Sequence, residues 1–148
     1  MSKQEVKTGI HFSQVETGDL SQWPDYSISL PGVDLPGKLF LKDLLGLTGC
    51  EISINSMMPG ESMPFYHRHH HNEEVYIFIK GQGQVQIDGK ILDVKEGSIV
   101  RIGPEAERLW RNNSDEQLAY IVLQVKENSL GQYGVDDASV PEKAVSWG

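Results

Sequence analysis

Short β-rich segments separated by turn residues follow one another through the second half of the chain, and this spacing constrains the fold most. The segments are residues 51–55, 74–80, 84–87, 91–94, 98–102, 108–111 and 118–125. Between two of them stands Asp88-Gly89, a strong hairpin signal because a type I′ turn needs positive φ at both central positions. No long segment shows helical periodicity. The pattern therefore predicts an all-β sandwich or barrel.

The two ends of the chain differ from this series. Residues 1–40 are polar and contain Pro24, Pro31 and Pro36. They predict an N-terminal arm with short strands near residues 11–15 and 26–30, followed by a helical turn over residues 41–46 that ends at a glycine. The sequence after residue 129 predicts a short C-terminal tail with a helical turn in residues 141–147. A chain of 148 residues has the size of one domain, so we expect a single domain over residues 1–148 with its barrel core at about 45–125.

Residues 74–80 are apolar on both faces of the strand that they predict. Tyr76 and Phe78 point to one face, and Val75, Ile77 and Ile79 point to the other. One face can line the barrel core, so the other must be covered by the N-terminal arm or by a second subunit. The second possibility predicts a homodimer.

The chain is acidic, with 13 Lys and Arg against 21 Asp and Glu and a net charge of −8. It repels nucleic-acid backbones and anionic lipids, so neither is an expected partner. The N-terminus lacks the apolar stretch of a signal peptide, and no apolar run is long enough to cross a bilayer, which predicts a cytoplasmic location. The single cysteine, Cys50, is interpreted as a buried core thiol rather than a nucleophile.

Four of the five histidines lie within residues 67–71, and a pair of glutamates follows after Asn72. In an extended chain alternate side chains share a face, so His67 and His69 project together. A turn near Asn72 would bring Glu74 against them, and two imidazoles with one carboxylate form a facial triad with positions open for water or substrate. Such a site suits a divalent transition metal: zinc, iron, manganese or nickel. The alternative is a solvated histidine-rich loop without a metal.

These residues resemble the first sequence motif of the cupin family. That motif runs Gly, a short spacer, His-x-His, three or four residues, Glu, six residues and Gly. This chain follows the same order with Gly60, His67, His69, Glu74 and Gly81. Its only departure is a spacer of six residues rather than five after the first glycine.

The second cupin motif is degenerate in this chain. It runs Gly, five residues, Pro-x-Gly, two residues, His, three residues and Asn. Gly97 and Asn112 stand in frame, but the proline is displaced by one residue and Arg108 occupies the histidine position. Shifting the frame by one residue puts Leu109 at that position, so neither frame supplies a histidine.

The resemblance covers about residues 45–125 and implies a double-stranded β-helix, which is a jelly-roll barrel, commonly as a dimer that exchanges N-terminal strands. Family metal sites usually use three histidines and one glutamate, of which His67, His69 and Glu74 carry over to this chain. Arg108 cannot be the fourth ligand, because a guanidinium stays protonated and has no lone pair to donate.

Two residues near the triad could replace one of its three members as a metal ligand. His71 shares the parity of His67 and His69, and Glu73 could replace Glu74 if the chain stays extended.

Arg108 is also a candidate for ligand binding. Arginine binds carboxylate or phosphate in a bidentate fork, so at the barrel mouth it would select an anionic ligand. An ion pair at the surface with Glu105 or Glu107 is the alternative. Trp110 lies two residues further along the same strand, and an inward Tyr76 would add an aromatic wall, although both residues are also typical of a plain core.

Two functions follow from these residues. The first is a metal-binding cupin that acts on a small anionic or sugar-phosphate substrate, because the resemblance suggests sugar-phosphate isomerases and small dioxygenases. The second is a non-catalytic or metal-free cupin that binds a small polar ligand, which the missing motif histidine favours. The sequence leaves open whether the protein is an enzyme.

Overall fold

The structure is a computed structural model that describes residues 4–148. Its helices are short, and almost all regular structure is β, so the all-β prediction is confirmed. In chain order the elements are β1 (Val6–Thr8), β2 (Ser13–Val15), the 3-10 helix η1 (Leu20–Asp25), β3 (Ser27–Leu30), β4 (Val33–Pro36), β5 (Lys38–Phe40), α1 (Lys42–Leu45), β6 (Glu51–Met57), β7 (Asn72–Lys80), β8 (Gln82–Ile87), β9 (Lys90–Lys95), β10 (Ile99–Ile102), β11 (Arg108–Arg111), β12 (Leu118–Lys126) and the 3-10 helix η2 (Gly134–Asp137).

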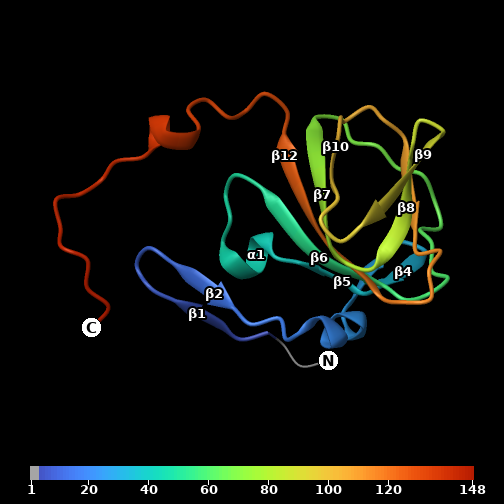
Figure 1. Ribbon diagram of the computed structural model, residues 1–148, viewed down its shortest axis with the longest axis horizontal. Helices are drawn as coiled ribbons and strands as arrows, with labels where there is room; N and C mark the ends of the chain where they lie inside the picture. The colour runs from blue at the N-terminus through green and yellow to red at the C-terminus, as the bar shows by residue number, and fades with distance from the viewer. Residues whose placement is uncertain (1–3) are drawn as a thin grey trace.

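Two antiparallel sheets form the barrel, and they face each other across its core (Figure 1). One has the strand order β10-β7-β12-β6-β5, and the other has the order β11-β8-β9. The larger sheet pairs strands far apart in sequence, such as β6 and β12, and the smaller sheet contains the β8–β9 hairpin. The core between the sheets contains Met57, Tyr76, Phe78, Val85, Val94, Ile102, Trp110, Leu118, Tyr120 and Val122.

Strand β7 divides its side chains as its alternation predicts. Tyr76 and Phe78 point into the barrel and are each 1% exposed. The opposite face is partly covered by the N-terminal arm, because Ile79 packs with Trp23 and Tyr26 of that arm. The edge of this outer face stays open, since Ile99 of β10 is 67% exposed.

The turn between β8 and β9 has the predicted conformation. Asp88 has φ 48° and Gly89 has φ 84°, so both central residues lie in the left-handed region that a type I′ turn requires. The register pairs Ile87 with Lys90 directly across the turn. Two residues thus set the pairing of the whole hairpin.

The predicted elements of the N-terminal arm are present in the structure, but the predicted burial of Cys50 in the core is not. Strands β2 and β3 lie near the predicted segments, and α1 ends at Gly46, which has φ 68°. Cys50, however, is only half-buried. It follows Gly49 in the loop after α1, one residue before β6, so its thiol lies outside the barrel core.

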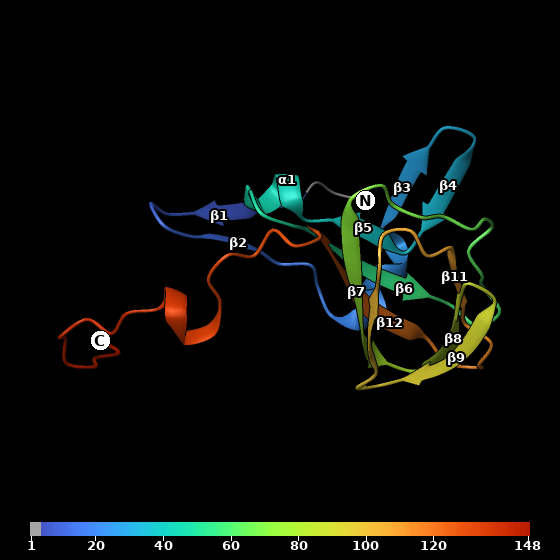
Figure 2. The same ribbon diagram turned by 90° about the horizontal axis from the view of Figure 1, so that it is seen from above.

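The C-terminal tail leaves the barrel after β12 and extends away from it in both views (Figures 1 and 2). The predicted helical turn in residues 141–147 is wrong, because these residues form no helix and the short helix η2 lies earlier. Val140 and Trp147 are almost fully exposed. None of the helices within residues 4–148 has the length and hydropathy needed to cross a membrane.

Candidate metal centre and ligand cavity

The first two candidate ligands lie on an extended segment between β6 and β7. His67 and Arg108 form an antiparallel bridge, in which each backbone N–H donates to the other residue's carbonyl at 3.2 and 3.0 Å. His69 N–H donates to Pro104 O at 2.8 Å. These bonds hold the segment extended against the chain around β11, so the two imidazoles share a face, with ring centroids 5.2 Å apart.

Glu74, near the start of β7, completes the cluster. Its side chain is nearly buried, and its Oε1 lies 3.5 Å from His67 Nε2 and 3.3 Å from His69 Nε2. One donor atom from each of the three residues lies within 4.8 Å of the other two. The structure therefore brings the three predicted ligands together, and their imidazoles are not splayed into solvent as a loose loop would leave them.

The two alternative ligands point elsewhere. His71 is exposed, and Glu73 accepts a hydrogen bond from Arg101 at 2.7 Å. Glu73 and Glu74 are neighbours on a strand, so their side chains lie on opposite faces of the sheet. Within residues 4–148, the cluster of His67, His69 and Glu74 is the one group of such donors that converges.

Charge and burial tune the protonation of the cluster. Burial raises the pKa of Glu74, but the hydrogen bond from His67 and the charges of both histidines and Arg108 outweigh this effect and lower the pKa below its usual range. Burial lowers the pKa of His69, while Glu74 opposes that shift. The favoured combination at neutral pH is an ionised carboxylate beside a neutral imidazole, which is the protonation a metal site needs.

Arg108 stands beside this cluster and is 0% exposed. Its guanidinium donates to three backbone carbonyls, those of Gly103 at 3.0 Å, Pro104 at 3.3 Å and Ala106 at 2.9 Å. Its Nε lies 3.6 Å from Glu74 Oε1, and no other carboxylate in the described part of the chain lies within 4 Å of it. The alternative, a surface pair with Glu105 or Glu107, is therefore absent from residues 4–148, and Arg108 is a buried cation paired with Glu74.

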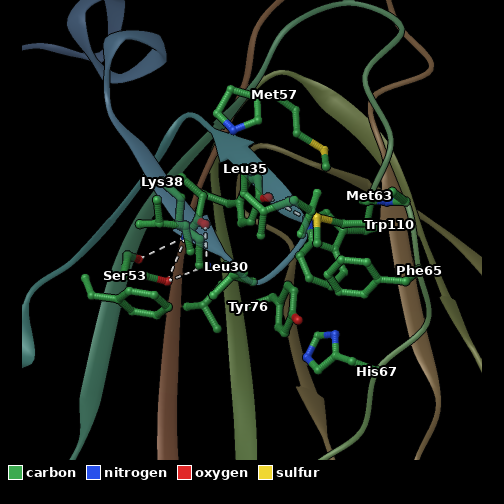
Figure 3. A pocket seen from close by; sticks show the side chains of 18 of the residues that line it. Leu30, Leu35, Lys38, Ser53, Met57, Met63, Phe65, His67, Tyr76 and Trp110 are labelled. Atoms are coloured by element: carbon green, nitrogen blue, oxygen red, sulfur yellow. Dashed lines mark hydrogen bonds between the residues drawn. The ribbon is translucent and has the colours of Figure 1, made fainter.

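The cluster opens into a cavity of about 660 Å³, a volume that suits a small-molecule ligand. Two predicted wall residues, Tyr76 and Trp110, line it with their rings T-shaped and 5.2 Å apart. The Trp110 indole N–H donates to Tyr120 Oη at 2.5 Å, which satisfies its polar edge. The hairpin β3–β4 covers the cavity with Leu30 and Leu35 (Figure 3). Arg108 is not among the lining residues, so its direct contact with a ligand stays a prediction.

A lysine in the cavity wall was missed by sequence reasoning. Lys38 of β5 donates from Nζ to Asn55 Oδ1 at 2.8 Å and to Ser53 Oγ at 3.2 Å. Burial lowers its pKa to about 8. The signal in the sequence was the polar alternation of Ser53 and Asn55 with Ile52 and Ile54, which indicates that one face of this strand meets polar partners.

Fold and site together define a class: an antiparallel double-stranded β-helix with a ligand-sized cavity and a two-histidine, one-glutamate cluster in its wall. The family model described as "Cupin domain" matches residues 54–124. A cupin protein from Bacteroides fragilis is 38% identical, with a TM-score of 0.69 over 70% of this chain and 88% of that chain. This chain therefore belongs to the cupin family.

More distant structures share the fold alone. A protein from Photorhabdus luminescens is 20% identical, with a TM-score of 0.58 over 71% of this chain and 84% of that chain. A sugar phosphate isomerase of the cupin superfamily from Silicibacter pomeroyi is 18% identical, with a TM-score of 0.55 over 60% of this chain and 58% of that chain. Among curated proteins, none matches this chain.

Proposed function

We propose that this cupin binds a divalent transition metal, such as zinc, iron, manganese or nickel, through His67, His69 and Glu74. The metal would serve the binding and conversion of a small anionic molecule in the adjoining cavity. The observation that carries the proposal is the convergence of three donor atoms within 4.8 Å in the wall of a ligand-sized cavity.

The donor set fits such an ion. Imidazole nitrogen suits zinc, iron and nickel, and a carboxylate adds one negative charge. His69 Nε2 is buried, and its 3.3 Å contact with Glu74 Oε1 lacks hydrogen-bond geometry, which is costly unless another group binds the nitrogen. A metal held there would polarise a substrate oxygen or activate water or dioxygen. Three protein ligands would leave coordination positions open for the substrate.

The neighbouring residues have separate parts in this proposal. Tyr76 and Trp110 form the aromatic wall that excludes water and orients the substrate. Arg108 stays in the proposed substrate site as a fixed positive charge that keeps Glu74 ionised and favours an anion nearby. Isomerisation of a sugar phosphate and oxygenation of a small anion are the two reactions we propose, the first of them named for a structural relative.

The second candidate function is metal-free ligand binding, and Arg108 favours it. The guanidinium stands where the family's second motif has a histidine, and its charge already partners Glu74. A barrel with this internal ion pair could bind a small polar ligand without a metal. The two functions differ in one measurable property, the metal content of the protein.

Metal analysis of untagged full-length protein tests the proposal. We expect about one first-row metal ion per chain in the parent and little in His67→Ala. His71→Ala is the matched control, because that imidazole is exposed and outside the cluster. A parent without metal, or equal metal content in the parent and His67→Ala, would remove these ligands and favour the metal-free function. Circular dichroism of each variant verifies that the barrel has folded.

We also propose that the protein is a homodimer, that it is located in the cytoplasm, and that it has no nucleic-acid or membrane partner. The support for a dimer is the aliphatic row Ile99, Ile77 and Ile121 on the outer face of the larger sheet. Of these residues Ile99 is 67% exposed, and exposed apolar side chains are typical of interfaces. Light scattering during size exclusion should give twice the 16.5 kDa chain mass, and a clean monomer would contradict the dimer.

A further inference from the structure

Lys38 is held at the cavity wall by the backbone around it. Strand β5 pairs with β6, and Lys38 lies directly opposite Asn55. The preceding residue, Gly37, has φ 67°; its N–H donates to Tyr26 O at 2.6 Å and its carbonyl accepts from Ser56 N–H at 2.7 Å. A Cβ at Gly37 would collide with the Ser56 carbonyl. These backbone contacts therefore fix the position from which the Lys38 side chain points into the barrel.

Within residues 4–148 the ammonium of Lys38 forms no ion pair, and Glu74 and Glu51 act on it only at longer range. Two of its three N–H donors go to neutral oxygens, those of Asn55 and Ser53. The ring of Phe40 lies below it, with the centroid 5.0 Å from Nζ. No carboxylate oxygen within residues 4–148 lies within 4.0 Å of Nζ. One N–H is left unused, on a cation that burial has removed from most of its water.

Ser53 leaves a second donor unused beside the first. Its Oγ accepts from Lys38 Nζ at 3.2 Å and from Asn55 Nδ2 at 3.0 Å. It donates to no atom of the described chain, although its side chain lies in the cavity wall and is nearly fully buried. A hydroxyl has one proton to donate. The cavity wall therefore presents one N–H and one O–H side by side, next to a positive charge.

We infer that Lys38 and Ser53 bind the carboxylate of a small ligand whose apolar body fills the cavity. One charged and one neutral donor match the two oxygens of a carboxylate, while a phosphate dianion has three oxygens and more charge to satisfy. Leu35, Met57 and Val122 supply apolar wall for the rest of the molecule. The inference rests on the proposed small-molecule function and narrows its ligand to a carboxylate with an apolar body.

The cavity therefore has two polar ends. Figure 3 shows Lys38 and Ser53 on one side of it, and Tyr76, Trp110 and His67 on the other. The N–H groups of Arg108 are largely taken by carbonyls, so Lys38 is the cation that faces the cavity. A ligand bound by its carboxylate at Lys38 would extend its other end toward the histidine cluster.

The test compares an acid with its neutral amide. Calorimetry at pH 7 on metal-free, full-length protein would measure 3-phenylpropanoate, 3-phenylpropanamide and phenethyl phosphate. We expect the acid to bind about tenfold more tightly than the amide, because a desolvated ammonium favours a charged acceptor. Lys38→Met should reduce this ratio to about one, and Ser53→Ala should lower it about threefold, as loss of one hydrogen bond implies. Lys90→Met removes an exposed lysine and should leave the ratio unchanged.

Failure of the acid to bind, equal binding of acid and amide, or an unchanged ratio in Lys38→Met overturns the inference. Phenethyl phosphate binding more tightly than the acid overturns the choice of carboxylate. If the acid is preferred over the amide only after zinc is added, and this preference survives in Lys38→Met, the carboxylate binds the metal and not Lys38. That result also overturns the inference. An acid preference that depends on Lys38 in protein that never binds metal leaves the inference standing and removes only the metal proposal.

Discussion

Arg108 shows at the scale of one residue how a buried charge can be stabilised. The guanidinium has no exposed surface, but three carbonyls accept its N–H groups and Glu74 balances its charge. The same charge helps to lower the pKa of Glu74. Losing either partner would leave the other charged and buried, which costs more than the pair contributes.

Replacing Arg108 by Met should destabilise the metal-free protein by about 3 kcal/mol, because Glu74 and three carbonyls lose a partner. The measurement is the free energy of unfolding in urea. Arg111→Met is the matched control on the same strand, since its exposed guanidinium donates only to Gln84, and we expect a loss below about 1 kcal/mol. Equal losses in the free energy of unfolding would show that the buried Arg108–Glu74 pair contributes no more to stability than the exposed Arg111 does.

Lys38 predicts a pH dependence of stability. Burial lowers its pKa from 10.5 to about 8, while Glu74 and Glu51 oppose the shift. Between pH 8 and 10.5 the unfolded chain keeps a proton at this lysine that the folded chain has lost, so stability should rise with pH by up to about 1.4 kcal/mol per unit. Below pH 8 both states are protonated and this contribution is constant.

The comparison is with Lys38→Met, which should lack this rise. Burial raises the pKa of Tyr76 and Tyr120, so the unfolded chain ionises first near pH 10 and stability falls there. Both proteins contain these tyrosines, and their effect cancels in the difference between the two urea-unfolding curves. Parallel curves from pH 7 to 10 would contradict the lowered pKa of Lys38.

At the scale of elements, strands β6 and β7 each contribute residues to one polar end of the cavity. Strand β7 places Glu74, Tyr76 and Phe78 on its inner face by simple alternation. Strand β6 places Ser53 and Asn55 toward Lys38 by the same rule. Strand alternation thus places Glu74, Ser53 and Asn55, whereas His67 and His69 are placed by the backbone bonds of their segment to Arg108 and Pro104.

The β8–β9 turn allows a test of an element's geometry. Gly89→Ala should destabilise the protein by about 1 kcal/mol, because an alanine at φ 84° meets the steric cost of the left-handed region. Gly131→Ala is the control, since a Cβ there has open space and its φ is not in that region. Thermal unfolding measures both, and an equal melting temperature in the two variants would contradict the role of this turn.

At the scale of the whole molecule, the N-terminal arm packs against the barrel, whereas the C-terminal tail does not. The arm buries Trp23 and Tyr26 against the outer face of the barrel, together with Ile54 and Ala119. The tail keeps apolar residues in solvent, with Trp147 99% exposed. The barrel strands occupy residues 38–126, and the single-domain organisation of residues 1–148 stays a prediction.

Removing residues 130–148 should change the free energy of unfolding by less than about 0.5 kcal/mol, as is usual for exposed segments. Removing residues 1–26 should cost at least about 3 kcal/mol, because two buried aromatic side chains and their packing are lost. Urea unfolding of both truncated chains measures the difference. A tail deletion as costly as the arm deletion would show that the tail packs against a surface in solution.

Much of the barrel could be predicted because its signals are local. β-rich segments between turn residues identified the strands, Asp88-Gly89 identified a hairpin, and parity placed His67 and His69 on one face. Glu74 was placed beside them by the expected turn near Asn72 and by the resemblance to the first cupin motif. Each of these inferences concerns residues within about ten positions of one another, where backbone geometry leaves few choices.

The sequence by itself determined the strands of the barrel from residue 51 onward and narrowed the metal ligands to His67, His69 and Glu74, with His71 and Glu73 as alternatives. Tertiary structure alone decided that Lys38 meets Ser53 and Asn55, that Arg108 turns to Glu74 rather than to solvent, and that the tail has no surface to pack on. The physical reason is that these outcomes depend on which strands pair and on what burial removes from water. Neither is encoded in the spacing of neighbouring residues.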